Sequence, residues 1–337
     1  MAKRGKVYLG VWFQRTTLHL KEVYRFLKYK EGVEGLDKNK ISTLWKNVSM
    51  SDVLYHEETR FDLVNGKSQD IDFSMTEDGI ILLSSPLSEP KKTVEKVEDY
   101  YSGKIGSAMD YLFSRGAPIP KDLKLVSDAY PLYFVVNELT PDKCIEFFKD
   151  FKDEVLSSFK NSEMEVYLGD KIAVINVFHS KAEAYTEEFL REIVLFREFE
   201  RQLKGYLNLH RNIWDEISEV REAKKIFFKD FNKVREELLA YQKTLSFVKS
   251  RINQMEDILD ARYASIDPNV KKQLDSFSFH FEMLKSNNRY IARLWDMTSE
   301  YLSSTLKMMN TFYEENTQRE LNVLKIVTLI GVIVNFV

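Results

Sequence analysis

The side chains that most often perform catalysis occur in this sequence, but not in a recognised catalytic arrangement. Asn65-Gly-Lys-Ser68 matches the end of a phosphate-binding loop, yet Phe61 stands where that motif needs its first glycine. The five histidines lie far apart, so none is paired at the spacing of a zinc site. The single cysteine, Cys144, lies in a helical pattern, which favours a core position over a nucleophile. We therefore expect no enzyme active site and no covalently bound cofactor.

Two clusters of charged residues near the C-terminus could bind ions. Lys285-Ser-Asn287-Asn288-Arg289 sets two cations beside amides, a combination that suits an anion or a nucleotide phosphate better than a metal. Glu314, Glu315 and Glu320 form an acidic group further along the chain. The alternative for each cluster is a solvated helix surface, so the residues alone do not decide between binding and solvation.

The overall composition limits the classes of function. A chain of 337 residues is long enough for two domains, and its net charge of −3 gives no basic field for binding a nucleic-acid polymer. Twelve glycines and seven prolines are few for this length, which favours long helices over a loop-rich fold.

Residues 1–180 mix strand and helix patterns. The run Val7–Phe13 is apolar and β-like, and Asn65-Gly66 predicts a hairpin turn between strands at 61–64 and 71–73. Residues 165–168 and 172–177 predict a second hairpin, with Gly169-Asp170 at its turn. We expect an α/β (or α+β) domain over 1–180.

After residue 180 the pattern becomes that of a coiled coil. Steps of three and four residues from Phe196 to Arg262 meet apolar side chains except at His210, Lys224 and Arg262. This seam predicts one long helix or two stacked helices, a helical hairpin over 181–267. A stalk helix is expected over 268–325, where the pattern continues with the polar residues Asn288 and Asn316 on the seam. Such polar seam residues fix register and oligomer number, so the stalk is expected to pack on copies of itself, on the hairpin, or on both.

The last twelve residues, 326–337, carry no charge. A membrane-crossing helix needs about 20 apolar residues, so we expect this segment to begin a transmembrane helix that continues past residue 337. A buried C-terminal helix is the alternative. Arg319 and Lys325 precede the segment, and positive charge on that side predicts that the large N-terminal part is cytoplasmic. Four residues of this helix share one face: Leu324, Thr328, Gly331 and Asn335.

The layout of an α/β domain, a helical hairpin and a stalk that enters a membrane resembles the CorA family of divalent-cation channels. Asn322-Val-Leu-Lys-Ile-Val-Thr-Leu-Ile330 resembles the family's stalk-to-pore junction. The resemblance implies a homopentamer in the inner or plasma membrane that conducts Mg²⁺-type cations passively. It implies that Leu324, Thr328, Gly331 and Asn335 line the pore and that Glu314, Glu315 and Glu320 form acidic rings at its mouth. The alternative for Leu324, Thr328, Gly331 and Asn335 is a face on which helices pack.

Two departures separate this chain from the family's pattern. The stalk stretch 285–289 has no carboxylate where the family's magnesium sensor would lie, and Leu321 stands where the junction asparagine is expected, with Asn322 one step later. We therefore assign no metal-binding residue. An alternative is a nucleotide-gated effector like the CorA-like subgroup of type III CRISPR systems, with an adenine nucleotide bound at Lys285, Asn287, Asn288 and Arg289. A third possibility is a membrane-anchored coiled-coil scaffold that transports nothing.

Overall fold

The computed structural model describes residues 5–13, 18–32, 34–58, 60–113, 131–222, 228–274 and 278–335. The chain divides into two compact units. The first unit is Met1–Gln202 with Met255–Ser286, and the second is Leu203–Gln254 with Asn287–Val337. Each long helix therefore contributes to both units, and each unit is described separately below.

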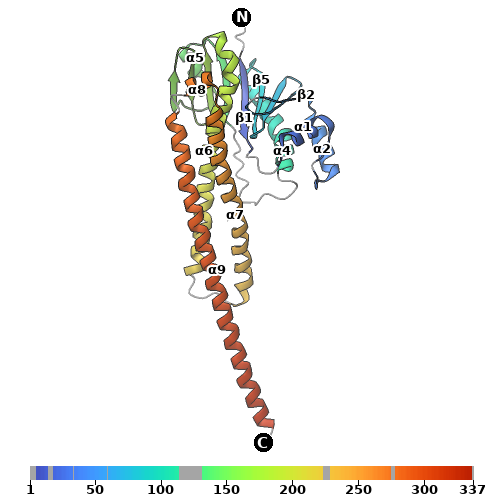
Figure 1. Ribbon diagram of the computed structural model, residues 1–337, viewed down its shortest axis with the longest axis vertical. Coiled ribbons are helices and arrows are strands. Elements are labelled where there is room, and N and C mark those ends of the chain that lie inside the picture. The colour runs from blue at the N-terminus through green and yellow to red at the C-terminus, as the bar shows by residue number, and fades with distance from the viewer. Residues whose placement is uncertain are drawn as a thin grey trace. The chain divides into compact units, whose positions relative to one another are not determined.

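The first unit contains a mixed nine-stranded sheet with the order β2-β3-β4-β5-β1-β6-β9-β8-β7 (Figure 1). Neighbouring described strands pair antiparallel, apart from the parallel pair β6–β9. The strands are β1 (Lys6–Trp12), β2 (Ser51–His56), β3 (Leu63–Ser68), β4 (Ile71–Thr76), β5 (Ile80–Pro86), β6 (Leu132–Asn137), β7 (Ser157–Lys160), β8 (Met164–Leu168) and β9 (Ile172–Val177).

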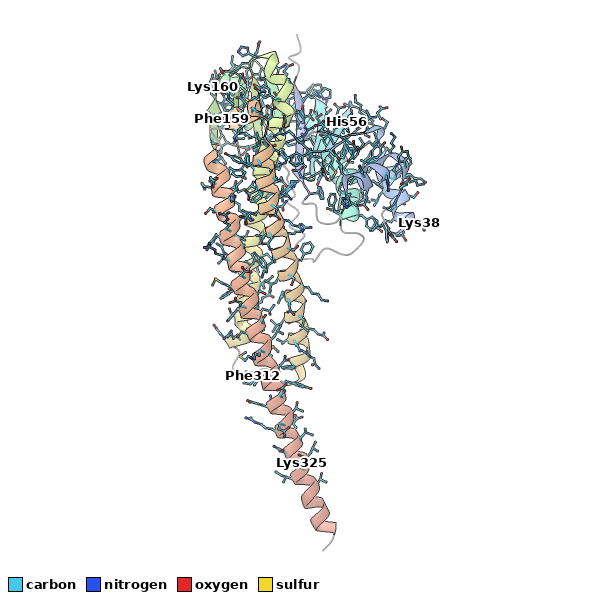
Figure 2. The ribbon with its side chains drawn as sticks, viewed as in Figure 1. Lys38, His56, Phe159, Lys160, Phe312 and Lys325 are labelled. Carbon is cyan, nitrogen blue, oxygen red and sulfur yellow. The ribbon has the colours of Figure 1, made fainter. Side chains whose placement is uncertain are left out.

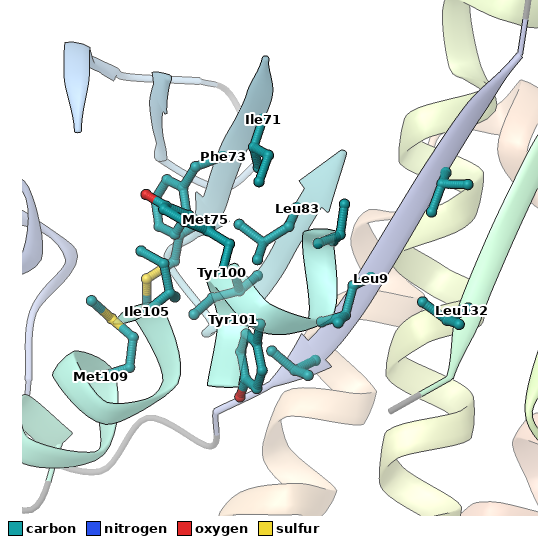
Figure 3. Close-up of a cluster of buried hydrophobic side chains, with 14 of the residues drawn as sticks. Leu9, Ile71, Phe73, Met75, Leu83, Tyr100, Tyr101, Ile105, Met109 and Leu132 are labelled. Carbon is teal, nitrogen blue, oxygen red and sulfur yellow. The ribbon is translucent and has the colours of Figure 1, made fainter. Parts of the chain in front are cut away.

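One face of this sheet forms the main hydrophobic core. Alternate residues of a strand point to the same face, so Leu9, Phe73 and Leu83 meet Tyr100 and Ile105 of the covering helices (Figure 3). The short helices of the unit are α1 (Leu20–Tyr29), α2 (Lys38–Val48), α3 (Pro90–Tyr100), the π-helical turn η1 (Tyr101–Ile105), α4 (Gly106–Phe113) and α5 (Pro141–Asp150).

The opposite face of β1 packs on the long helix α6 (Ser180–Glu222). A Cβ at Gly10 would lie 2.3 Å from a methyl carbon of Val194, so only glycine allows this close approach. The rings of Trp12 and Phe199 stack nearby, with centroids 5.8 Å apart. The first part of α6 is therefore fixed to the sheet.

The second unit is built from the distal parts of α6, α7 (Phe228–Ser265) and α9 (Ser278–Asn335), while the short helix α8 (Pro268–Leu274) belongs to the first unit. The rings of Trp214 in α6 and Tyr301 in α9 stack at 4.6 Å, and Lys249 of α7 pairs with Asp296 of α9 at 2.6 Å. Seam residues of the three helices are buried: Ile213, Ile217, Leu238, Leu245, Val248, Ile252, Ile291, Trp295, Leu302 and Met309. A mixed α/β part followed by long helices is therefore confirmed, with α6 and α7 as separate helices; Lys224 lies outside the described residues.

The first predicted hairpin exists, but its predicted turn was wrong. Asn65 and Gly66 lie inside β3, opposite Ser74 and Phe73 of β4. The chain turns instead after Ser68, where Gln69 has a left-handed φ of +57°. Gly66 serves close packing, because a Cβ there would lie 2.4 Å from the sulfur of Met50. The second hairpin, β8–β9, is confirmed with Gly169-Asp170 between its strands.

Candidate functional site

The predicted pore-lining residues all lie in α9. Leu324 and Thr328 are exposed, and the Thr328 hydroxyl donates a hydrogen bond to the Leu324 carbonyl at 2.8 Å. Gly331 and Asn335 belong to the same continuous helix, and their side-chain surroundings lie outside the described residues. At 3.6 residues per turn, the four positions fall within an arc of about 60° on one side of the helix.

Among the described side chains of α9, Met309 is the last one that is buried. We call residues 287–309 the inner part of α9 and residues 310–328 the outer part. Met309 is 0 % exposed, whereas Phe312 is 52 %, Val323 60 % and Ile326 59 % exposed. The Tyr313 ring still stacks on Phe231 of α7, with centroids 4.8 Å apart, and beyond this contact no other described helix of the second unit runs beside α9 as far as Lys325 (Figure 2). Apart from the contact at Tyr313, the outer part is thus a helix whose apolar side chains Phe312, Val323, Leu324 and Ile326 are exposed.

The acidic residues predicted to attract cations lie on this outer part. Glu314, Glu315 and Glu320 are all exposed. From Glu320 the helix rises by about 6 Å to Leu324 and by about 12 Å to Thr328, so the last carboxylate precedes these predicted lining residues by about one to two turns.

No helix among the described residues combines the length and apolar character that a bilayer crossing needs. The same residues contain no group of three or more His, Cys, Asp and Glu side chains that could hold a metal ion.

The predicted ligand-binding residues of the stalk occupy different environments. The Lys285 ammonium lies 2.6 Å from a carboxylate oxygen of Asp260 in α7. Asn288 is 1 % exposed and its amide donates to the Ile252 carbonyl at 3.1 Å. Asn287 and Arg289 are exposed. Lys285 and Asn288 therefore bond within the chain, and Asn288 contributes to packing of α9 on α7.

A buried ionic cluster in the first unit was not predicted. Arg262 of α7 is 3 % exposed and donates one hydrogen bond to Glu192 of α6 at 2.6 Å. It also binds Asp78, just before β5, through two of its nitrogens, one of them 3.0 Å from Oδ1. The Phe61 ring lies 4.7 Å from its guanidinium carbon. These contacts tie the sheet, α6 and α7 together.

The charges of this cluster shift one another's pKa values. Burial by itself would raise the pKa of Asp78, but the charge and hydrogen bonds of Arg262 outweigh burial and lower that pKa. Burial raises the pKa of Glu192, and the charge of Arg262 reverses only part of this rise. Buried ion pairs of this kind are costly to break, because the remaining charge has no water to solvate it. The cluster is therefore a structural joint, and its sequence signal was an arginine at one of the three polar positions of a mainly apolar seam.

A second polar joint attaches α8 to the sheet. Gln273 is 4 % exposed and its amide donates to a carboxylate oxygen of Glu163 at 2.6 Å. Asn161 donates to the Gln273 carbonyl oxygen, and Tyr185 of α6 donates to Glu163. The hairpin end between β7 and β8 therefore contacts both α6 and α8.

The class of molecule that these observations define is a mixed-sheet domain joined by buried polar contacts to long helices, the last of which ends in an uncovered apolar stretch. No protein-family model and no curated protein matches the sequence. Among solved structures, the complete CorA magnesium transporter from Methanocaldococcus jannaschii is similar at 12 % identity and a TM-score of 0.33, over 60 % of this chain and 76 % of that one. The soluble domain of CorA from the same organism is similar at 12 % identity and a TM-score of 0.30, over 52 % of this chain and 86 % of that one.

Proposed function

We propose that this chain forms the cytoplasmic part and the beginning of the first membrane helix of a CorA-like channel. The channel would conduct a divalent cation such as Mg²⁺ through a homopentameric pore. The observation that carries this proposal is the outer part of α9, whose apolar residues Val323, Leu324 and Ile326 are 60 %, 61 % and 59 % exposed. A soluble protein rarely leaves such a surface uncovered, and copies of α9 with a bilayer beyond them would cover it.

The polar groups of the outer part suit cation passage. Five copies of Glu314, Glu315 and Glu320 would form acidic rings that raise the local cation concentration. Thr328 would follow with its hydroxyl oxygen facing water, while its O–H donates a hydrogen bond to the Leu324 carbonyl. The junction sequence Asn322–Ile330, with its resemblance to the CorA pore entrance, supports the same order of acidic mouth and apolar pore.

A flux assay tests the proposal. Full-length protein is reconstituted in lipid vesicles that contain a Mg²⁺-sensitive dye, and we expect Mg²⁺ entry down its gradient without an energy source. Thr328→Val should reduce the entry rate several-fold. Thr311→Val is the matched control, because Thr311 is also exposed on α9 and donates to the carbonyl four residues earlier, at 3.1 Å. Absence of flux would contradict the channel and favour the non-transporting scaffold.

Gating by an adenine-nucleotide messenger, as in the CRISPR-associated subgroup, is the second candidate. Its support on the stalk is the exposure of Asn287 and Arg289. The same vesicles test this candidate. Mg²⁺ flux that begins only after an adenine nucleotide is added on the side of the membrane that carries the large N-terminal part would favour the nucleotide-gated form.

A further inference from the structure

The sheet of the first unit has a hollow of about 340 Å³ on the face opposite its main core. The register places Lys67, Asp72, Ser84 and Tyr8 directly opposite one another, in one row across β3, β4, β5 and β1. Opposed residues on neighbouring strands point to the same side of a sheet, so these four side chains share the floor of the hollow.

A second row beside the first provides an amide, a hydroxyl and two apolar side chains. Leu54, Asn65, Ser74 and Leu82 are opposed across β2, β3, β4 and β5. Small side chains at the centre of the two rows leave the space, and Leu54, which is 51 % exposed, forms an apolar wall.

The floor is rich in hydrogen-bond donors that are not used within the chain. Tyr8, Ser74 and Ser84 are only 6 %, 8 % and 5 % exposed, and their hydroxyls have no hydrogen-bond partner among the residues the structure describes. All three side chains line the hollow, so their hydroxyls can form hydrogen bonds with a molecule that enters it. This set of donors points to a ligand with several acceptor oxygens.

Two lysines add positive charge to these donors. The ammonium groups of Lys6 and Lys67 lie 3.7 and 3.5 Å from the carboxylate of Asp72, which is too long for hydrogen bonds. Each ammonium therefore keeps its N–H groups for another acceptor, and the trio carries a net charge of +1. At the rim, Glu187 is paired with Arg191 at 2.7 Å, which neutralises it, and Asp52 is the remaining acid of the lining.

We propose that this hollow binds a small organic phosphate, of about the size of a mononucleotide. The phosphate oxygens accept from Lys6, Lys67 and the hydroxyls of Ser84 and Tyr8, and the organic part packs against the leucine wall. A volume of about 340 Å³ lies at the lower end of the range for small-molecule pockets, which fits one phosphate ester rather than a larger oligomer. This site is separate from residues 285–289 and does not depend on the channel function.

Isothermal titration of the 337-residue chain with four probes tests the proposal. Adenosine 5′-monophosphate and ribose 5-phosphate should bind, inorganic phosphate should bind more weakly, and adenosine should bind at least tenfold more weakly than its monophosphate. Failure of both phosphate esters to bind, or equal binding of adenosine and its monophosphate, would overturn the proposal. Equal binding of inorganic phosphate and ribose 5-phosphate would overturn the role of the organic part.

Three variants test where the ligand binds and whether the site prefers a negatively charged ligand. Lys67→Gln should weaken binding of the phosphate ester at least tenfold, whereas Asp72→Asn should tighten it several-fold by removing the only anion on the floor. Lys46→Gln, on the exposed surface of α2, is the matched control and should change nothing. Equal affinities of Lys67→Gln and Lys46→Gln, or weaker binding by Asp72→Asn, would contradict an anion site here. Circular dichroism of each variant confirms that it is folded, and since the readout is binding, the result is independent of ion flux.

Discussion

The inner and outer parts of α9 are one continuous helix, yet their seam residues differ sharply in burial. In the inner part, seam residues such as Trp295 and Met309 are 0 % exposed against α6 and α7, while in the outer part Phe312 continues the same spacing and is 52 % exposed. A heptad pattern therefore predicts that a helix face needs a partner but does not say which chain provides it. The inner seam is satisfied within one chain, and we propose that the outer one is covered by copies and membrane.

The largest expected loss of stability comes from removing a buried charge, compared with removing an exposed charge on the outer part of α9. Arg262→Met would leave Asp78 and Glu192 without their cation, and we expect a loss of roughly 3–5 kcal/mol in the free energy of unfolding. Arg319→Met, on the exposed outer part, should change stability by less than about 0.5 kcal/mol. Urea unfolding of both variants measures the difference, and equal losses would contradict a buried joint at Arg262.

Truncating a seam side chain should lower stability much more in the inner part of α9 than in the outer part. Trp295→Ala in the inner part removes a fully buried side chain, so we expect a cost of about 3–5 kcal/mol. Phe312→Ala in the outer part should cost less than about 1 kcal/mol in the isolated chain, because its ring is half exposed. A cost for Phe312→Ala that equals that of Trp295→Ala would mean that the outer part is already covered in solution.

The two asparagines of the seam give a smaller test of the same idea. Asn288→Ala removes the hydrogen bond to the Ile252 carbonyl and should lower stability by about 1–2 kcal/mol. Asn316→Ala, at an exposed position, should leave the unfolding midpoint of the isolated chain unchanged. Chemical denaturation monitored by circular dichroism compares the two, and a stable Asn288→Ala variant would be evidence against this intrachain role.

The smallest expected effect concerns pH. His210 lies within the inner bundle, 5.8 Å from the Trp295 ring, and burial lowers its pKa below the ordinary value of 6.5. The unfolded chain then binds a proton more readily than the folded one, so stability should fall as the pH drops below about 6.5. His210→Phe should lose less stability than the wild type between about pH 7 and pH 5.5. Identical pH dependence in the two proteins would show that His210 does not titrate in this range.

The sequence predicts the elements of this molecule better than their contacts. Apolar periodicity correctly indicates the sheet domain and the long helices, because burial imposes it directly on the residue order. The Asn65-Gly66 turn was misplaced because glycine also serves close packing, here against Met50, and local sequence does not distinguish the two uses. Arg262 stood out on its seam, but its partner Asp78 lies 184 residues earlier, beyond the reach of any local pattern.

The candidate site divides in the same way. The order of acidic residues and small polar residues on α9 could be predicted, since it depends only on helix geometry. The internal bonds of Lys285 and Asn288 could not, because they depend on which helix lies opposite. Likewise, the floor of the sheet hollow depends on strand register, which places Tyr8 beside Ser84 across 76 residues of sequence.

Cysteine cross-linking tests most directly whether the outer part of α9 lines a pore in an assembly of copies. Burial raises the pKa of the native Cys144 thiol to about 11, so that thiol should give little background. Leu324→Cys is placed on the proposed pore side, and Ile326→Cys lies about 200° around the helix as the control. In full-length protein in vesicles under mild oxidation, we predict disulfide-linked dimers for Leu324→Cys and few for Ile326→Cys. Equal cross-linking at both positions, or none at Leu324→Cys, would contradict a pore lined by this helix face.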